Sequence, residues 1–229
     1  MLGMKRARFE VAERTQATSF GGVPVALEVA RVTGLIQSLD QRLHVFKIHH
    51  PYHESDHVMN VALNALCGGR TLDDIEVRRN DRAFLDALGT DAIPDPTTAG
   101  DFCRRFGAED IEALMAAINE TRVNVWRQQG TQLTGQTAVI DADGTMVTTY
   151  GECKEGMDIS YKGEWGYHPL LVSLANTGEP LFIVNRSGNR PSHEGVAPRF
   201  DVSSGGFGLS RSTRCCSLLF HHPHGRRRA

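Results

Sequence analysis

The sequence predicts an α+β protein in which a helical region comes first and antiparallel strands follow. Residues 23–130 place apolar side chains at helical spacing, as in Leu35, Leu39 and Leu43. After Gly130, short runs of β-forming residues alternate with turns. Helices followed by consecutive strands indicate two domains rather than alternating βαβ units.

Capping residues and turns divide the helical region into separate helices. Ser55 and Asp56 are expected to cap one helix, and Asp81 another. The proline-rich turn at residues 93–98 ends in a hydroxyl that is expected to cap the helix after it. The last helix is expected over residues 109–129.

Four segments after Gly130 are expected to form strands, and the turn at residues 176–179 is expected to join the last two into a hairpin. The four segments are residues 137–140, 146–150, 168–175 and 180–185.

Composition excludes several classes of protein. The net charge of -2 provides no general basic field for nucleic acid, so contacts to DNA require local basic groups. Five cysteines without zinc-type spacing argue against a disulfide framework or a structural metal site. The sequence has no apolar run that would span a bilayer and no secretory signal. We therefore expect a cytoplasmic protein without a membrane partner.

An acidic motif, Asp141-Ala142-Asp143, directly follows an apolar strand segment. Residues i and i+2 of a strand face the same side, so the two carboxylates repel each other unless a divalent cation lies between them. The alternative is a surface turn, because Asp-Gly is a common turn dipeptide.

Two classes of enzyme use acids in such a place. Residues 139–145 match the first motif of haloacid-dehalogenase-like phosphatases, in which Asp141 would be the nucleophile and Asp143 the acid/base. In ribonuclease-H-like nucleotidyl transferases, an aspartate on the first strand instead holds one of two magnesium ions. The helical region before the motif and the strands after it favour the second class. The expected fold is therefore a helical region followed by the first antiparallel strands of an incomplete ribonuclease-H-like domain.

Five stretches, in this order, resemble DDE transposases of the insertion-sequence family 1380 type. They lie at residues 51–58, 68–75, 93–102, 165–170 and 185–195, and the third reads Ile-Pro-Asp-Pro-Thr-Thr-Ala-Gly-Asp-Phe.

The resemblance implies Mg²⁺-dependent cleavage and transfer of DNA at the inverted repeats of transposon ends. It makes Asp143 the best match to the first catalytic and metal-binding acid, with Asp141 as its neighbour. Side chains of a polar loop and of one helix are then candidate DNA contacts, although the loop also fits a plain hairpin and the helix a packing role. These side chains are Arg104, Arg105, Arg186, Asn189, Arg190 and His193.

The sequence also departs from the family pattern. The resemblance implies a second aspartate and a further acid downstream, but Asp201 is the last acid of the chain. We expect a truncated copy that lacks catalytic activity, with an aberrant and disordered tail over residues 201–229. An incomplete sheet exposes an edge, so we also expect homo-oligomers. The alternative is a remnant that binds DNA or a transposase without catalysis.

These expectations divide the chain into four parts. They are an irregular lead-in at residues 1–22, a helical region at 23–130, a partial catalytic domain at 131–200 and the tail.

Overall fold

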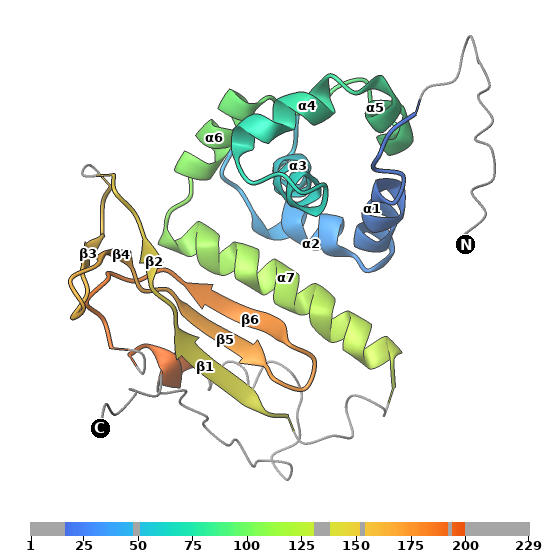
Figure 1. Cartoon of the computed structure of the whole chain (residues 1–229). Coiled ribbons are helices and arrows are strands. Elements are labelled where there is room, and N and C mark those ends of the chain that lie inside the picture. Colours follow the sequence, from blue (N-terminus) through green and yellow to red (C-terminus); the bar gives the residue numbers. More distant parts are fainter. Residues whose placement is uncertain (1–16, 48–50, 131–137, 152–153, 192–193, 200–229) are drawn as a thin grey trace, which may run out of the picture. The chain divides into compact units, whose positions relative to one another are not determined.

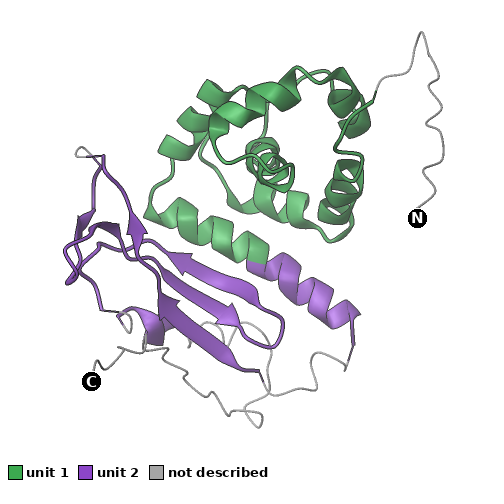
Figure 2. Ribbon diagram, in the orientation of Figure 1, with its two compact units in different colours: residues 1–118 green, residues 119–229 purple. Residues whose placement is uncertain are grey.

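A computed structural model describes residues 17–47, 51–130, 138–151, 154–191 and 194–199 (Figure 1). The chain divides into two compact units, residues 1–118 and 119–229, with the boundary inside one long helix (Figure 2). We call them the helical unit and the sheet unit. The expected α+β class is confirmed. The helices are α1 (Val23–Val32), α2 (Leu35–Arg42), α3 (Glu54–Leu66), the 3-10 turn η1 (Leu72–Asp74), α4 (Ile75–Arg79), α5 (Arg82–Leu88), α6 (Pro96–Arg104) and α7 (Ala108–Gln128).

The helical unit is built around α3, which lies at the centre of the shorter helices (Figure 1). Its core is a cluster of buried apolar side chains from α1, α3 and α5. A second cluster joins Leu39 of α2 and Leu43, the residue after α2, to Ala117 of α7, and all three are fully buried. The spacing of Leu35, Leu39 and Leu43 in the sequence therefore locates part of the core. The first cluster comprises Val23, Ala30, Met59, Leu63, Phe84 and Leu85.

The expected helix caps are partly confirmed. Asp81 caps α5 by accepting the Phe84 N–H at 3.0 Å. The cap of α6 is the carboxylate of Asp95, which accepts the Thr98 N–H at 2.9 Å, so the expectation of a capping hydroxyl was wrong. A carboxylate carries more negative charge than a hydroxyl and competes better for the free N–H groups of the first turn.

The start of α3 also differs from the expectation. His53 is its N-cap residue, rather than Ser55 or Asp56. Asp56 lies in the first turn and accepts the His53 N–H at 2.8 Å. This reciprocal bond satisfies an N–H group outside the helix, as in a capping box.

The main sheet of the sheet unit has the strand order β1-β5-β6 and is antiparallel throughout. It comprises β1 (Ile140–Gly144), β5 (Leu170–Leu174) and β6 (Glu179–Val184). The last two form the expected hairpin. β1 begins later than expected, so Asp141 and Asp143 lie within the strand rather than beyond its end. Pairing with β5 extends the strand through the acids.

A second, small sheet has the order β2-β4-β3. Its strands are β2 (Val147–Thr148), β3 (Asp158–Ile159) and β4 (Trp165–Tyr167). The sequence indicates β2 but not β3 or β4, which are too short to show a period. Gly166 lets the strands approach, since a Cβ there would lie 2.1 Å from the Val147 carbonyl oxygen.

The C-terminal half of α7 belongs to the sheet unit and is anchored to β6. Asn119 Nδ2 donates to the Leu181 carbonyl at 3.0 Å, and Trp126 Nε1 donates to the Glu179 carboxylate at 3.1 Å. Arg122 donates to the Pro180 carbonyl at 2.6 Å and to Asn119 Oδ1. Burial lowers the pKa of Arg122 from its usual value, and the Glu179 charge opposes this.

No helix within the described ranges is both long enough and apolar enough to cross a bilayer.

Candidate functional site

The acids of β1 lie on one face of the main sheet. Asp141 pairs with Ser173 and Asp143 with Leu171, and all four side chains are only partly covered or exposed. The alternating residues Ile140 and Ala142 are buried on the other face. Two residues along a strand span about 6.6 Å. The strand therefore presents both carboxylates on the same face, as the sequence predicts.

The carboxylates differ in their contacts. Asp143 Oδ1 accepts the N–H of the next residue, Gly144, at 2.8 Å. Asp141 Oδ1 is shielded from solvent and has no hydrogen-bond partner among the described residues. A buried carboxylate oxygen without a partner is costly. A hard divalent cation, which prefers oxygen ligands, would satisfy it.

The end of β1 lies against two basic side chains. A Cβ at Gly144 would lie 2.4 Å from His168 Cε1 and 2.8 Å from an Arg186 guanidinium nitrogen. Glycine at position 144 therefore allows this approach. The structure thus brings the residue after Asp143 next to the first residue of the predicted DNA-contacting loop.

Arg186 organises that loop through its guanidinium group. The group donates to the carbonyls of His168 and Pro191, both at 3.0 Å, and to that of Glu194 at 2.5 Å. Burial lowers the pKa of Arg186, while the Glu194 charge raises it and the Arg190 charge lowers it further. Arg186 therefore holds the loop in place, a role that its sequence context does not indicate.

The remaining loop residues are more accessible. Arg190 pairs with Glu194 at 2.8 Å, and Asn189 Oδ1 accepts a bond from the Ser187 hydroxyl at 3.2 Å. Arg186 and Arg190 line an open cleft of about 430 Å³ together with Tyr167. His193 lies outside the described residues, as does the predicted tail.

Arg104 and Arg105 belong to the helical unit, whereas the acids and the loop belong to the sheet unit. Arg104 ends α6 and pairs with Asp101 at 2.7 Å, with 74% of its side chain exposed. The Arg105 guanidinium lies over the Phe46 ring, 5.3 Å from its centroid. Both arginines are exposed at the C-terminal end of one helix.

A group that sequence reasoning missed lies between α2 and α3. Ligand atoms of Asp40, His53 and Glu54 lie within 4.8 Å of one another, and among the described residues only this group of three has metal-binding side chains so close. Both carboxylates also have structural roles. Asp40 accepts the Ser55 N–H at 3.2 Å, and the buried Glu54 accepts the Phe46 N–H at 3.1 Å. The group thus ties the start of α3 to the segment before it.

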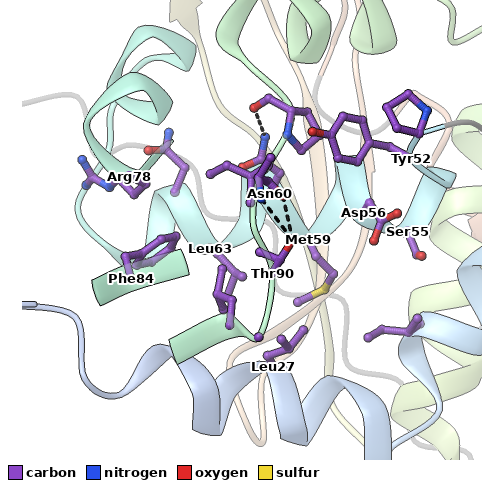
Figure 3. Close-up of a pocket in the computed structure, with 18 of the residues that line it drawn as sticks. Leu27, Tyr52, Ser55, Asp56, Met59, Asn60, Leu63, Arg78, Phe84 and Thr90 are labelled. Atoms are coloured by element: carbon purple, nitrogen blue, oxygen red, sulfur yellow. Dashed lines mark hydrogen bonds between the residues drawn. The ribbon is translucent and has the colours of Figure 1, made fainter. Parts of the chain in front are cut away.

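A cavity of about 370 Å³ lies beside α3 in the helical unit (Figure 3). Leu27, Met59 and Leu63 give it an apolar wall, and the side chain of Asn60 donates to the Pro94 carbonyl at 2.9 Å at its edge. Two lining side chains have a buried polar atom without a partner among the described residues, Asn64 Oδ1 and Arg78 Nε. Asp141 and Asp143, the acids predicted from the sequence to be catalytic, do not line this cavity.

The antiparallel neighbours of β1 bear on the two classes of enzyme that use such acids. The haloacid-dehalogenase-like interpretation requires a doubly wound, mostly parallel sheet. β1 instead pairs antiparallel with β5, and β5 with β6. These antiparallel pairings do not fit the parallel sheet of the phosphatase fold.

Comparison with known proteins finds no match among curated proteins and none among solved structures. Residues 7–201 match the family model described as transposase DDE domain, group 1, which covers most of the chain and includes both acids of β1. The chain therefore belongs to the family of transposases with a group 1 DDE domain.

Proposed function

We propose that Asp141 and Asp143 hold a divalent metal ion, Mg²⁺, for the metal-dependent DNA cleavage and transfer that characterise this family. The observation that carries the proposal is the pair of carboxylates on one face of β1, with Asp141 Oδ1 lacking a partner among the described residues. Asp143 is the primary ligand by its match to the first acid of the family, and Asp141 is its neighbour.

When bound, the metal would stabilise negative charge on the phosphate and on the attacking oxygen. The residues of the chain have supporting roles. The Gly144 N–H fixes one oxygen of Asp143, which leaves the other available to a ligand. Ile140 and Ala142 are buried on the opposite face and hold the strand in place. The partly covered position of the acids limits the water that competes for the cation.

DNA would be held by groups in both units. Arg190 and Asn189 in the loop, with Arg104 and Arg105 in the helical unit, present hydrogen-bond donors suited to phosphate oxygens. His193 is a further candidate contact to DNA, on the ground of the sequence alone. Arg186 would act mainly by positioning the loop, because its guanidinium is already engaged with backbone carbonyls.

We further propose that the main sheet is the opening of a ribonuclease-H-like domain, with the four-part division of the chain given above. The order of three antiparallel strands with the acid on the first supports this. Catalysis by two metals needs more acids than one strand supplies. The 229-residue polypeptide by itself is therefore expected to bind metal without cleaving DNA.

Metal binding is tested by titrating Mn²⁺, a paramagnetic substitute for Mg²⁺, into the full chain and measuring free Mn²⁺ by electron paramagnetic resonance. Wild type should bind one Mn²⁺ ion. Asp143→Asn should weaken this binding at least tenfold, and the double variant Asp141→Asn with Asp143→Asn should abolish it. Asp91→Asn is the matched control, because Asp91 is highly exposed and lies in the helical unit. Undiminished binding by the double variant would show that the acids of β1 are not ligands.

Cleavage is tested by incubating the same proteins with supercoiled DNA and Mg²⁺ or Mn²⁺. The expected result is no nicking above that of Asp143→Asn. Metal-dependent nicking by wild type that Asp143→Asn removes would overturn the proposed inactivity and support the proposed site.

The second candidate function is DNA binding without catalysis, which the two exposed arginines at the end of α6 favour. A gel shift with inverted-repeat DNA would test it. The double variant Arg104→Gln with Arg105→Gln should bind the DNA more weakly and with a smaller dependence on salt concentration than wild type. Arg82→Gln, on another helix, should bind as wild type does. Equal shifts by all three proteins would exclude α6 as the DNA contact.

A further inference from the structure

One face of the small sheet is apolar and exposed. Trp165 pairs with Ile159, and Tyr167 pairs with Val147. Paired residues share a face, and so do residues two apart on a strand. These four side chains therefore share a face, which we call the aromatic face. Its Tyr167 also lines the cleft beside Arg186 and Arg190, and the Tyr167 hydroxyl donates to the Glu155 carbonyl at 2.7 Å. Trp165 is 53% exposed, Val147 49% and Ile159 45%.

The loop that Arg186 organises is joined to the small sheet, since Tyr167 and Ser187 form an antiparallel bridge and the His168 N–H donates to the Arg186 carbonyl at 2.8 Å. A Cβ at Gly188 would lie 2.3 Å from the Asp158 carbonyl oxygen and 2.7 Å from that of Gly166. The Ser187 hydroxyl also bonds to the Asp158 carboxylate at 3.3 Å. The loop is thus held to the small sheet by backbone pairing and close packing.

Two further exposed aromatic side chains follow strands of the small sheet. Tyr150 follows β2 and is 95% exposed, and Tyr161 follows β3 and is 89% exposed. The Lys162 ammonium lies 5.5 Å from the centroid of the Tyr161 ring. Exposed aromatic side chains gathered in one small sheet are enriched at binding surfaces rather than at surfaces without a ligand.

The chemistry of the aromatic face suits flat, π-rich partners. Its four members are uncharged, and Asp158, which precedes Ile159 on β3, is engaged by the Ser187 hydroxyl. Aromatic side chains on a sheet stack unpaired bases in several nucleic-acid-binding folds, and this stacking tolerates any base sequence. Base pairs in a duplex present only their edges, so a duplex cannot use such a surface.

The position of the aromatic face connects it to the proposed site. Only Thr145 and Met146 separate β1, with its two acids, from β2. Extended chain spans about 3.3 Å per residue, so Val147 lies within roughly 13 Å of Asp143. A strand whose phosphate is at the acids therefore has bases within reach of this surface.

We propose that the aromatic face binds unpaired bases of the DNA strand that the acids of β1 engage, with Trp165 as the main stacking platform. The inference rests on the proposed function, because that function brings DNA to the sheet unit.

Intrinsic fluorescence tests the proposal, since the chain has two tryptophans. Trp126 is 8% exposed and bonded to Glu179, whereas Trp165 is exposed. Single-stranded oligothymidylate should quench the emission of wild type and of Trp126→Phe, but not that of Trp165→Phe. Trp165→Ala should weaken single-strand binding, measured by anisotropy of labelled DNA, by roughly 5- to 150-fold. A duplex of the same length should bind without quenching.

Tyr161→Ala serves as a second variant, because Tyr161 is so exposed that its removal leaves the fold intact, and it should also weaken binding of the single strand. Anisotropy without quenching, together with unchanged affinity in Trp165→Ala and Tyr161→Ala, would overturn the inference and leave the proposed function standing. Absence of DNA binding in every form would overturn both. A Trp165 emission that depends on protein concentration without DNA would instead assign the aromatic face to a second copy of the chain.

Discussion

Protonation of His57 should destabilise the helical unit. The His57 ring is 2% exposed and is stacked on Phe102 at 4.7 Å between centroids, with Phe46 at 5.1 Å. Its Nδ1 atom has no partner among the described residues. Burial lowers the pKa of His57, and the nearby charges of Asp56 and Glu54 only partly oppose this.

The sign of the effect follows from the two states. Unfolded histidine has a pKa of about 6.5, so above that pH neither state takes up the proton and stability is unaffected. Below it, the unfolded chain binds the proton and the folded chain resists it. The free energy of unfolding therefore falls by at most about 1.4 kcal/mol per pH unit, until the lowered pKa of the folded state is reached.

The variant His57→Leu removes the titration and nearly keeps the volume. Loss of ring stacking costs roughly 0.5–1.5 kcal/mol, whereas removal of a buried nitrogen without a partner gains about 1–3 kcal/mol. At pH 7.5 the variant should thus be as stable as wild type or slightly more stable. At pH 5.5 its advantage should grow by up to about 1.4 kcal/mol.

Urea unfolding of the full chain, followed by circular dichroism at pH 5.5, 6.5 and 7.5, measures this difference. His44→Leu is the matched control, because His44 is an exposed histidine of the same unit. If His57→Leu and wild type lose stability in parallel between pH 7.5 and 5.5, the reasoning about the buried ring is wrong.

Three other substitutions test the packing. Gly166→Ala should destabilise the sheet unit by roughly 1–3 kcal/mol in thermal unfolding, because its Cβ would meet the Val147 carbonyl. Gly178→Ala is the control and should cost only about 1 kcal/mol, because the space around Gly178 is open. Equal costs for the two variants would argue against the close approach at Gly166. Asp81→Ala should lower stability by about 1 kcal/mol by removing the cap of α5 and the bond from Thr18, and an unchanged melting temperature would contradict that role. Arg122→Leu should cost about 1–3 kcal/mol, since it removes the donor to the Pro180 carbonyl and the ion pair with Glu179, which keeps its bond from Trp126. An unchanged unfolding transition, followed by Trp126 fluorescence, would refute it.

Local signals in the sequence are sufficient for much of the helical unit. The spacing of Leu35, Leu39 and Leu43 identifies a buried stripe, and Asp81 identifies the start of α5. The sequence does not predict that Asp95, rather than a threonine, caps α6, because several adjacent residues can accept the same N–H groups. Such competition is decided by geometry that the sequence does not contain.

The sheet unit depends on contacts between distant residues and is harder to predict. The alternation of Asp141 and Asp143 with buried residues follows from strand geometry once the strand is recognised. The short strands β3 and β4 do not show a period, and the close approach of β4 to β2 requires glycine at position 166. The engagement of Arg186 with three carbonyls is equally hidden, because a loop arginine in sequence resembles a free DNA contact.

The contact between Gly166 and Gly188 has a mechanical consequence. A Cβ at Gly188 would meet the carbonyl oxygens of Asp158 and Gly166, so the loop packs directly on the backbone of the small sheet. A displacement of the loop by a phosphate would be transmitted to the strand that carries Trp165, and a base stacked on Trp165 would in turn restrain the loop. Substitutions at the two glycines should therefore be strongly non-additive, as expected of two parts that move as a single body.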